Sequence, residues 1–364
     1  MKFVAAVLLV GVTSAPAAEP PASSRAIPTA KASASFRIDL ERIRAEQRVK
    51  SISVALIDGG AVGLAVAVGE AEARKPATRT TPYNIASLAK PLTAEVALRL
   101  AGRGRIALDE NMSAHWTDPD IAQDPRRNSL TPAVALSHRT GFPNWRKDKL
   151  AFERDPGQAF GYSGEGYEYL ARFIAKKTGR PLDRWAGDLV FRPLGMRETT
   201  YTDKPWLHGR MALPHDPEGK ALKPVVRKEP VASDDVYSTP TDYARFIAGI
   251  LKAKGGTVPV GRFAVLADRR PDLCAKLPPS DCPTEAGMAL GWESYLIAGK
   301  RYLMHTGSDE GTFTFAYFSP DSRSGAVIFT NSSHGGSVVL PVLRLAGRDA
   351  PFVDFLERLV KGPG

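Results

Sequence analysis

Ser87-Leu88-Ala89-Lys90 lies where an extended stretch, residues 82–86, gives way to a helical pattern. Side chains three positions apart face the same side of a helix, so the serine and the lysine would rise from one turn. A serine in the first turn also lies near unpaired backbone N–H groups and the positive end of the helix dipole. The stretch therefore offers a hydroxyl, an amine that can take its proton, and donors for a developing oxyanion.

A serine and a lysine at this spacing also occur together by chance, so the flanking sequence decides their meaning. Ser87 has the chemistry of a helix N-cap. The residues after it predict a strongly apolar helical face made by Leu92, Ala94, Val96, Ala97 and Leu100. We therefore expect a buried helix that holds Ser87 rigidly.

Composition limits the classes of protein to consider. The 364 residues suffice for one large unit or for two lobes that share a cleft, and the apolar fraction of 43% allows a sizeable core. The formal net charge is +10, but the lysines and arginines are scattered rather than gathered into a stripe or interleaved with aromatic residues. We therefore expect no nucleic-acid partner.

The first 18 residues have the pattern of a cleavable signal peptide. Lys2 gives a positive start, residues 3–12 are apolar but too few to span a bilayer, and Ala15-Pro16-Ala17 offers a small-residue cleavage site. A buried N-terminal helix is the alternative. Residues 19–34 are rich in proline, alanine and serine and predict a disordered lead-in. Because no later apolar stretch is long enough to cross a membrane, we expect a periplasmic or secreted protein without a membrane span.

Cys274 and Cys282 are the two cysteines of the chain. In an oxidising compartment, a disulfide across the short loop between them is favoured over two free thiols. Neither cysteine has partners at the spacing of a zinc site, so we expect no metal.

The hydrophobic periodicity predicts an α+β fold with a single domain over residues 35–364. Residues 36–49 have a helical pattern, and residues 52–57 and 62–68 are predicted to form a hairpin that turns at residues 58–61. Further helices are predicted at residues 88–101, 165–178, 183–190, 241–254 and 341–360, and further strands at residues 288–297, 301–305, 312–318 and 326–330.

The predicted strands lie at opposite ends of the chain. We therefore expect one antiparallel sheet built from residues of about 35–85 and 285–364. Terminal helices would flank that sheet, and a mostly helical lobe, residues of about 86–284, would be inserted between its halves. A cleft between the two lobes is the natural place for Ser87.

Two further segments carry groups suited to acyl transfer, which needs a second proton-handling group and an oxyanion site. Tyr162 lies in a predicted loop, residues 160–167, just before a predicted helix, and we expect its phenol to approach Lys90. His305-Thr306-Gly307 ends a predicted strand, where the backbone N–H of Ser308 would serve an oxyanion.

Taken in order, Ser87-x-x-Lys90, Tyr162-Ser163-Gly164 and His305-Thr306-Gly307 resemble the motifs of class C serine β-lactamases and their relatives. These relatives include DD-carboxypeptidases, D-amino-acid peptidases and β-lactamase-fold esterases. Supporting strings are residues 136–143, residues 192–196, Ser238-Thr239 with Asp242, and Gly291-Trp292. The resemblance covers residues from about 40 to 340, and it implies a β-lactamase/transpeptidase-like fold for a single catalytic domain.

The resemblance also implies roles for individual residues. Ser87 would be the nucleophile, and Lys90 and Tyr162 would share the duty of general base, which requires a lowered pKa. The backbone N–H groups of Ser87 and Ser308 would form the oxyanion hole. His305 would complete the catalytic group, and the substrate would be bound at Thr306, Gly307 and Gly164. No cofactor or metal is implied.

Three positions depart from the relatives. Those proteins usually have asparagine at Gly164, whose amide holds the acyl-side amide of the substrate, and many have lysine at His305. A histidine is only partly charged near neutral pH, so we expect weaker attraction of a substrate carboxylate. Relatives also tend to have two glycines near Asp234-Asp235, before Ser238-Thr239. We interpret this pair as part of a solvated loop, with recognition of a cationic substrate group as the alternative.

The predicted function is that of a secreted serine hydrolase that acts through an acyl-enzyme on D-alanyl peptide amides or β-lactams. Its substrate would be a small molecule or a peptidoglycan fragment. A β-lactamase-fold carboxylesterase is the alternative, and a non-catalytic peptidoglycan- or penicillin-binding protein is less favoured. We interpret His138 and His215 as structural hydrogen-bonding residues and most tryptophans as core or cleft wall, with Trp145 close enough to line a pocket.

Overall fold

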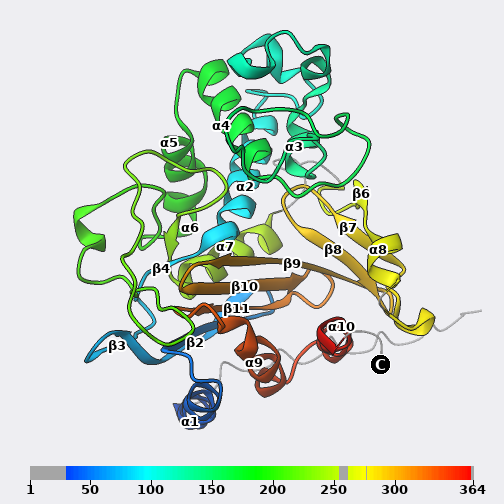
Figure 1. Ribbon diagram of the computed structural model, residues 1–364. Coiled ribbons are helices and arrows are strands. Elements are labelled where there is room, and N and C mark those ends of the chain that lie inside the picture. Colours follow the sequence, from blue (N-terminus) through cyan, green and yellow to red (C-terminus); the bar gives the residue numbers. More distant parts are fainter. Residues whose placement is uncertain (1–29, 254–260, 276, 362–364) are drawn as a thin grey trace, which may run out of the picture.

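The centre of the molecule is an antiparallel sheet (Figure 1). The computed structural model describes residues 30–253, 261–275 and 277–361. Nine strands of these residues form the sheet in the order β3-β2-β1-β11-β10-β9-β8-β7-β6. Their bounds are β1 Ser51–Asp58, β2 Ala61–Glu72, β3 Lys75–Pro76, β6 Ala267–Asp268, β7 Glu285–Met288, β8 Glu293–Ile297, β9 Lys300–Asp309, β10 Thr312–Ser319 and β11 Ser324–Thr330. The sheet thus combines strands from both ends of the sequence, as predicted.

The two ends of the chain meet where β1 pairs with β11. Ile52 lies opposite Thr330 and Ile57 opposite Gly325. Alternate residues of a strand point to opposite faces, and both faces of this sheet are covered. Ile52 and Val54 pack into the core beneath the sheet, whereas Ala55 and Ile57 pack into the core above it. This double burial explains why β1 and β11 have almost continuously apolar sequences.

Helices cover the two faces of the sheet. Helices α1 (Ala30–Glu46), α9 (Val339–Ala346) and α10 (Ala350–Lys361) lie along one face (Figure 1). Helix α7 (Pro240–Lys252) packs on the other face, against β1, β2 and β11. The lobe beyond it contains α2 Ala89–Ala101, α3 Pro132–Leu136, α4 Gly164–Thr178, α5 Leu182–Ala186 and α6 Arg192–Leu194, with the short pair β4 Tyr83–Asn84 and β5 Tyr237–Ser238. Helix α8 (Arg270–Cys274) lies apart from this lobe, beside β7.

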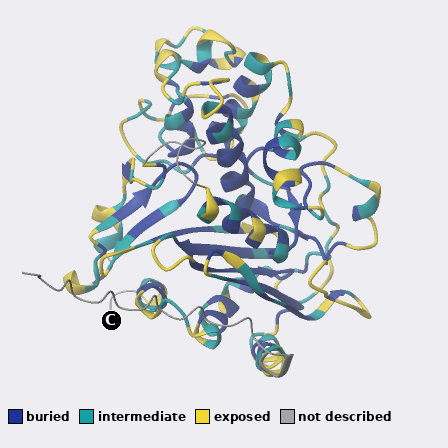
Figure 2. Cartoon of the chain, turned by 180° about the vertical axis from the view of Figure 1, so that it is seen from behind, coloured by how far each residue is buried: buried dark blue, intermediate teal, exposed yellow. Residues whose placement is uncertain are grey.

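Helix α2 forms the axis of this lobe and is buried almost all round (Figure 2). All its residues except Arg99 and Ala101 are buried. A helix that is apolar on every side belongs in the interior of a protein rather than on one of its surfaces. The predicted buried helix after Ser87 is therefore confirmed.

Several boundaries differ from the predictions. Strand β9 continues to Asp309, so His305-Thr306-Gly307 lies within the strand and does not end it. The strand predicted at residues 288–297 is a hairpin, β7 and β8, because the chain turns at Gly291 with a φ of +87°. The helix predicted at residues 341–360 is two helices, because Gly347 ends α9 in the left-handed conformation. Helix α1 begins at Ala30, so residues 30–34 are helical and not part of a disordered lead-in. The predicted signal peptide, and residues 19–29, lie outside the described residues.

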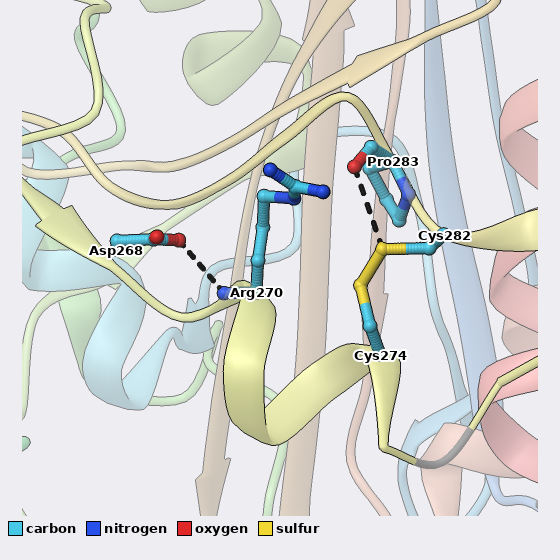
Figure 3. The surroundings of a disulfide bond; sticks show 5 residues. All are labelled: Asp268, Arg270, Cys274, Cys282 and Pro283. Carbon is cyan, nitrogen blue, oxygen red and sulfur yellow. Dashed lines mark hydrogen bonds between the residues drawn. A yellow bond between two sulfur atoms is a disulfide. The ribbon is translucent and has the colours of Figure 1, made fainter. Parts of the chain in front are cut away.

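The predicted disulfide is present between Cys274, at the end of α8, and Cys282 (Figure 3). Their Cα atoms are 5.3 Å apart, within the usual range for a disulfide. No helix in the described part of the chain is long and apolar enough to cross a bilayer.

Candidate active site

Ser87 lies at the centre of a 3₁₀ turn, Ala86–Leu88, that connects β4 to α2. It was expected to be an N-cap, but its side chain caps neither the turn nor the helix. The serine is partly exposed, while both of its neighbours are buried. Ala86, just before it, has a φ of +45°, a region that a residue with a Cβ enters only at a cost in energy. The backbone thus presents the hydroxyl at the surface in a strained turn.

Hydrogen bonds from the surrounding elements hold this turn. Thr314, on β10, donates its hydroxyl to the Ile85 carbonyl at 2.8 Å. The Tyr243 hydroxyl, on α7, donates to the Leu88 carbonyl at 2.9 Å. These bonds come from the sheet and from the helix packed on it, so the position of Ser87 depends on both. Thr314 and Tyr243 were not recognised from the sequence, because no local pattern links them to the serine.

Lys90 lies in the first turn of α2 and is 1% exposed. Its Nζ atom is 3.0 Å from the Ser87 hydroxyl oxygen and 3.0 Å from the Ser233 carbonyl oxygen. Burial lowers the pKa of Lys90 to about 8, although the nearby carboxylates of Asp234 and Glu168 oppose this shift. A substantial fraction of the lysine is therefore neutral near pH 8 and can accept a proton from Ser87.

Glu168 and Ser233 complete the surroundings of Lys90, and sequence reasoning missed both. Glu168 lies on α4, and its carboxylate accepts hydrogen bonds from the Ser233 N–H at 3.0 Å and from the Ser233 hydroxyl at 2.7 Å. Ser233 in turn offers its carbonyl to Lys90. The two residues are 65 positions apart in the chain. No local spacing could have revealed this pair.

Tyr162 lies beside the serine and the lysine. The Lys90 Nζ atom is 4.8 Å from the centre of the Tyr162 ring. Burial raises the pKa of Tyr162, while hydrogen bonding to Ser87 acts in the opposite direction. A lowered pKa was expected for a group that acts as general base, and for Tyr162 this expectation is wrong because burial disfavours the phenolate. The phenol therefore stays protonated and is suited to passing a proton on.

His138 supports Tyr162 from behind. The two rings are stacked with their centres 4.3 Å apart. The Nδ1 atom of His138 accepts a hydrogen bond from the Ser163 N–H at 3.0 Å. Burial, followed by the charge of Lys90, holds the pKa of His138 well below its usual value, so the ring is neutral. These contacts agree with the structural role predicted for His138.

His215 lies away from this group. Its Nδ1 atom is 3.2 Å from the Asn331 carbonyl oxygen, and its backbone carbonyl accepts a hydrogen bond from the Ser333 N–H at 3.0 Å. It therefore also has the structural character expected from the sequence.

Strand β9 passes next to the Ser87 turn at Gly307. A Cβ atom at this glycine would lie 2.2 Å from the Ile85 carbonyl oxygen, 2.4 Å from the Thr314 hydroxyl oxygen and 3.1 Å from the Ser87 nitrogen. Real Cβ atoms do not approach other atoms so closely, so this position requires glycine. Gly307 therefore allows the strand to approach the backbone of Ser87.

His305, two residues earlier on β9, is buried and neutral. Its Nδ1 atom is 2.7 Å from the Thr306 carbonyl oxygen, and the side chain is 2% exposed. Burial and the charge of Lys90 lower the pKa of His305 to about 3. The expected partial positive charge near neutral pH is therefore wrong, because desolvation favours the uncharged ring. Because the Thr306 carbonyl can only accept, the single N–H of the neutral His305 ring is at Nδ1, so the ring offers a substrate carboxylate neither a charge nor a free N–H.

The other predicted residues of β9 occupy different faces of the strand. Thr306 lines an apolar cavity against α9 and α10, on the face of the sheet opposite to the core that contains Ile85 and Leu88 beside Ser87. Only the backbone of Thr306 therefore faces the site. Ser308 is exposed beyond Gly307 and pairs with Phe313 on β10. Its N–H group remains a predicted oxyanion donor.

Gly164 begins α4, two residues after Tyr162. Its N–H donates to the side-chain oxygen of Asn144 at 2.9 Å. Glu165, next to it, is bound by Arg146 through bonds of 2.8 and 3.0 Å and is almost fully buried. Glu165 is therefore committed to an ion pair and cannot replace the asparagine that relatives have at position 164.

Asp234 and Asp235 were expected to lie in a solvated loop. This expectation is wrong, because Asp235 is buried and Asp234 is partly buried. Asp235 is 6% exposed and forms a 2.7 Å ion pair with Arg227. Burial raises the pKa of Asp234 to about 6, and its charge influences Lys90. The carboxylates of both residues lie within 4.8 Å of that of Asp309. Asp234 therefore acts on the electrostatics of the site.

A comparison with models of protein families identifies residues 36–346 as Beta-lactamase. The chain belongs to the Beta-lactamase family. The resemblance inferred from the three motifs is confirmed, and so is the predicted β-lactamase/transpeptidase-like fold.

Curated relatives in the Beta-lactamase family match most of the chain at low identity. One is the D-alanyl-D-alanine-carboxypeptidase/endopeptidase AmpH of Escherichia coli K12, which is 24% identical over 315 residues, covering 75% of this chain and 80% of that protein. Another is penicillin-binding protein 4 of Amycolatopsis lactamdurans, which is 24% identical over 332 residues, covering 84% of this chain and 86% of that protein.

Solved structures with the same fold include the octameric penicillin-binding protein homologue from Pyrococcus abyssi. It has a TM-score of 0.69 and 21% identity, and the match covers 87% of this chain and 78% of that one. The beta-lactamase/D-alanine carboxypeptidase from Yersinia pestis, complexed with citrate, has a TM-score of 0.64 and 20% identity. The match covers 88% of this chain and 98% of that one. At these identities the likeness establishes the fold.

Proposed function

We propose that this protein is a serine hydrolase that forms an acyl-enzyme through Ser87, with D-alanyl peptide amides or β-lactams as substrates. The observation that carries the proposal is the 3.0 Å contact between the Ser87 hydroxyl and the amine of Lys90, whose pKa burial lowers to about 8. The substrate class is supported by the names of the relatives, which include a D-alanyl-D-alanine-carboxypeptidase/endopeptidase and a penicillin-binding protein.

Acylation would begin with neutral Lys90. The Ser233 carbonyl accepts one of the amine hydrogens, which leaves the lone pair free to take the proton of Ser87. The Ser87 oxygen then attacks the carbonyl carbon of the substrate, and the carbonyl oxygen becomes an oxyanion. The backbone N–H groups of Ser87 and Ser308 would stabilise this oxyanion, as preorganised donors do in acyl transfer.

Collapse of the intermediate breaks the bond between the carbonyl carbon and the leaving nitrogen. The protonated Tyr162 passes a proton to that nitrogen and regains one from Lys90. A water molecule then attacks the ester on Ser87 by the same route, and the serine recovers its proton. Each proton taken from an attacking group is thus returned to a leaving group.

An esterase that acts on uncharged acyl groups is the second candidate. It is favoured by the neutral state of His305, because a neutral ring attracts a substrate carboxylate less than an ammonium group would. It is also favoured by Gly164, which has no side-chain amide to hold a peptide bond. Ester substrates need neither of these interactions.

We also propose that the protein is exported. The predicted signal peptide at residues 1–18 and the disulfide between Cys274 and Cys282 both support this, since disulfides persist in oxidising compartments. The test is to express the full chain with an alkaline phosphatase fusion and determine its N-terminus. Phosphatase activity with cleavage near residue 18 is expected, while an intact N-terminus in an inactive fusion would contradict export.

The activity test uses a fluorescent penicillin, a chromogenic cephalosporin, an acyl-D-alanyl-D-alanine peptide and p-nitrophenyl esters. We expect the wild type to be labelled or to turn over at least one class, and Ser87→Ala to do neither. Turnover of the peptide or β-lactam selects the first candidate, and turnover of esters alone selects the second. If Ser87→Ala matches the wild type with every compound, a non-catalytic role replaces both.

A further inference from the structure

Trp145 stands out among the five tryptophans of the chain because it is the most exposed. Its residue is 46% exposed, whereas Trp292 is buried and the other three are partly buried. It is also the single aromatic residue among the large apolar side chains that the described residues expose. A tryptophan whose role is only to fill the core would not leave so much of its ring in water.

The Trp145 ring lies over the backbone of Gly164. A Cβ atom at Gly164 would be 2.9 Å from Cη2 and 3.1 Å from Cζ2 of the indole, and 3.0 Å from the Asn144 carbonyl oxygen. The ring therefore occupies the direction in which any side chain at position 164 would point. The missing side chain at Gly164 and the exposed ring of Trp145 are thus two parts of one arrangement.

The loop that carries Trp145 is fixed in place. Arg146 binds Glu165 through its backbone N–H at 3.2 Å and through its guanidinium, and the same guanidinium reaches Asp118 at 2.9 Å. The Ser163 hydroxyl donates to the Pro143 carbonyl at 2.8 Å. A surface that is ordered before binding loses less entropy when a ligand contacts it.

The position of the ring relates it to the reaction. Gly164 follows Tyr162 by two residues, and Tyr162 contacts Lys90 beside Ser87. We infer that Trp145, lying over Gly164, is a specificity residue that binds a planar apolar group on the acyl side of the substrate. The inference rests on the proposed acyl-transfer function and adds the class of acyl group that the site prefers.

Binding to inactive protein tests the inference without turnover. Calorimetry compares N-phenylacetyl-D-alanyl-D-alanine with N-acetyl-D-alanyl-D-alanine on the Ser87→Ala protein. We expect the phenylacetyl peptide to bind roughly two- to tenfold more tightly, the range given by one aromatic contact. Adding Trp145→Ala should reduce this ratio to about one, and adding Trp145→Phe should keep most of it.

Steady-state kinetics give a second measurement on proteins that keep Ser87. The quantity is the ratio of kcat/KM for p-nitrophenyl phenylacetate to kcat/KM for p-nitrophenyl acetate. Trp145→Ala and Gly164→Ala should both lower this ratio, since the added methyl group displaces the ring. Val360→Ala, which truncates an exposed apolar residue on α10, is the matched control and should leave it unchanged.

The outcomes separate the two proposals. If Trp145→Ala leaves both ratios as in the parent protein, or if the parent shows no preference in either, the specificity role is wrong whatever the activity of Ser87. If Ser87→Ala retains full turnover, the acyl-enzyme proposal is wrong, while a binding preference lost in Trp145→Ala would still establish the aromatic subsite.

Discussion

The Nζ atom of Lys90 lies 3.0 Å from the Oγ atom of Ser87, in a position where the lysine side chain is 1% exposed. Water would surround an exposed lysine and keep its pKa near 10.5, so the amine would be charged at neutral pH. Burial instead lowers the pKa to about 8. The fold thus converts a common surface cation into a base next to a hydroxyl.

Replacement of this base gives the first prediction. Lys90→Met keeps the length of the side chain but removes the amine, and we expect kcat/KM to fall roughly 10²- to 10⁴-fold, as for the loss of a general base. The initial rate with the best substrate of the wild type measures the effect. Lys176→Met removes an exposed lysine of α4 and should retain wild-type kinetics. Equal rates for Lys90→Met and the wild type would rule out Lys90 as the base.

The pH dependence of activity follows from the groups that face Lys90. His138 and His305 are neutral above pH 6.5 because burial lowers the pKa of each ring, and Tyr162 stays protonated because burial raises the pKa of its phenol. Asp234 and Glu168 are the nearby carboxylates, and their charges favour the protonated form of Lys90. The value of kcat/KM should therefore rise with pH as Lys90 loses its proton, with a midpoint near its pKa of about 8.

Asp234→Asn tests the electrostatic part of this prediction. Asp234, with a pKa of about 6, is ionised at pH 8 and favours the charged form of Lys90. Its neutralisation should lower the pKa of Lys90 and move the rise in kcat/KM to lower pH. Asp148→Asn, at an exposed loop position, should leave the profile in place. A profile that is flat from pH 6.5 to 9 in the wild type would contradict the assignment.

The same shift has a consequence for stability. The pKa of Lys90 is lower in the folded protein than in the unfolded chain, so between about pH 8 and the ordinary value of 10.5 the unfolded chain binds more protons. The contribution of Lys90 to the free energy of unfolding should therefore increase with pH across this window, and it is unfavourable below it. Urea unfolding of the wild type and Lys90→Met at pH 7.5 and 9.5 measures the difference.

Gly307→Ala should separate β9 from the turn that carries Ser87. The added methyl group would collide with the Ile85 carbonyl and the Thr314 hydroxyl, two groups that fix the turn of Ser87. We expect kcat to fall by a factor on the order of 10², since small displacements of reacting groups have effects of this size. Overpacking should also reduce the free energy of unfolding by about 1–3 kcal/mol.

Gly187→Ala is the control for this variant, because nothing lies within 4 Å of a Cβ atom there. Stopped-flow acylation and urea unfolding are measured on the same samples. Together they distinguish a folded protein with displaced site residues from a protein that has lost its fold. Normal kcat in a folded Gly307→Ala protein would show that the close approach of the strand does not matter for catalysis.

His138→Leu removes the stacking partner of Tyr162 and the acceptor of the Ser163 N–H. A buried N–H without a partner reduces the free energy of unfolding by about 1–3 kcal/mol. We expect this loss of stability together with lower activity, because the Tyr162 ring is no longer held beside Lys90. His208→Leu replaces a histidine whose side chain is 58% exposed and should change neither quantity. Wild-type stability in His138→Leu would argue against the support that we assign to the ring.

Much of the fold was predictable because its signals are local. The apolar runs of β1 and β11, the helix that follows Ser87, and the pairing of Cys274 with Cys282 all followed from short stretches. The hairpin at Gly291 and the break at Gly347 are also encoded locally, by glycines in the left-handed conformation. They were missed because apolar periodicity continues across both positions.

The amino-acid sequence alone indicated which residues to expect at the candidate site: a serine, an amine, a phenol and a histidine in a fixed order. The tertiary structure decided their protonation states and the groups that surround them. It lowered the pKa of Lys90 so that the neutral amine is accessible, left His305 uncharged, placed Glu168 and Ser233 around the amine, and set Trp145 over Gly164. The physical reason is that desolvation and close packing depend on all the atoms around a group, and most of those atoms come from distant parts of the chain.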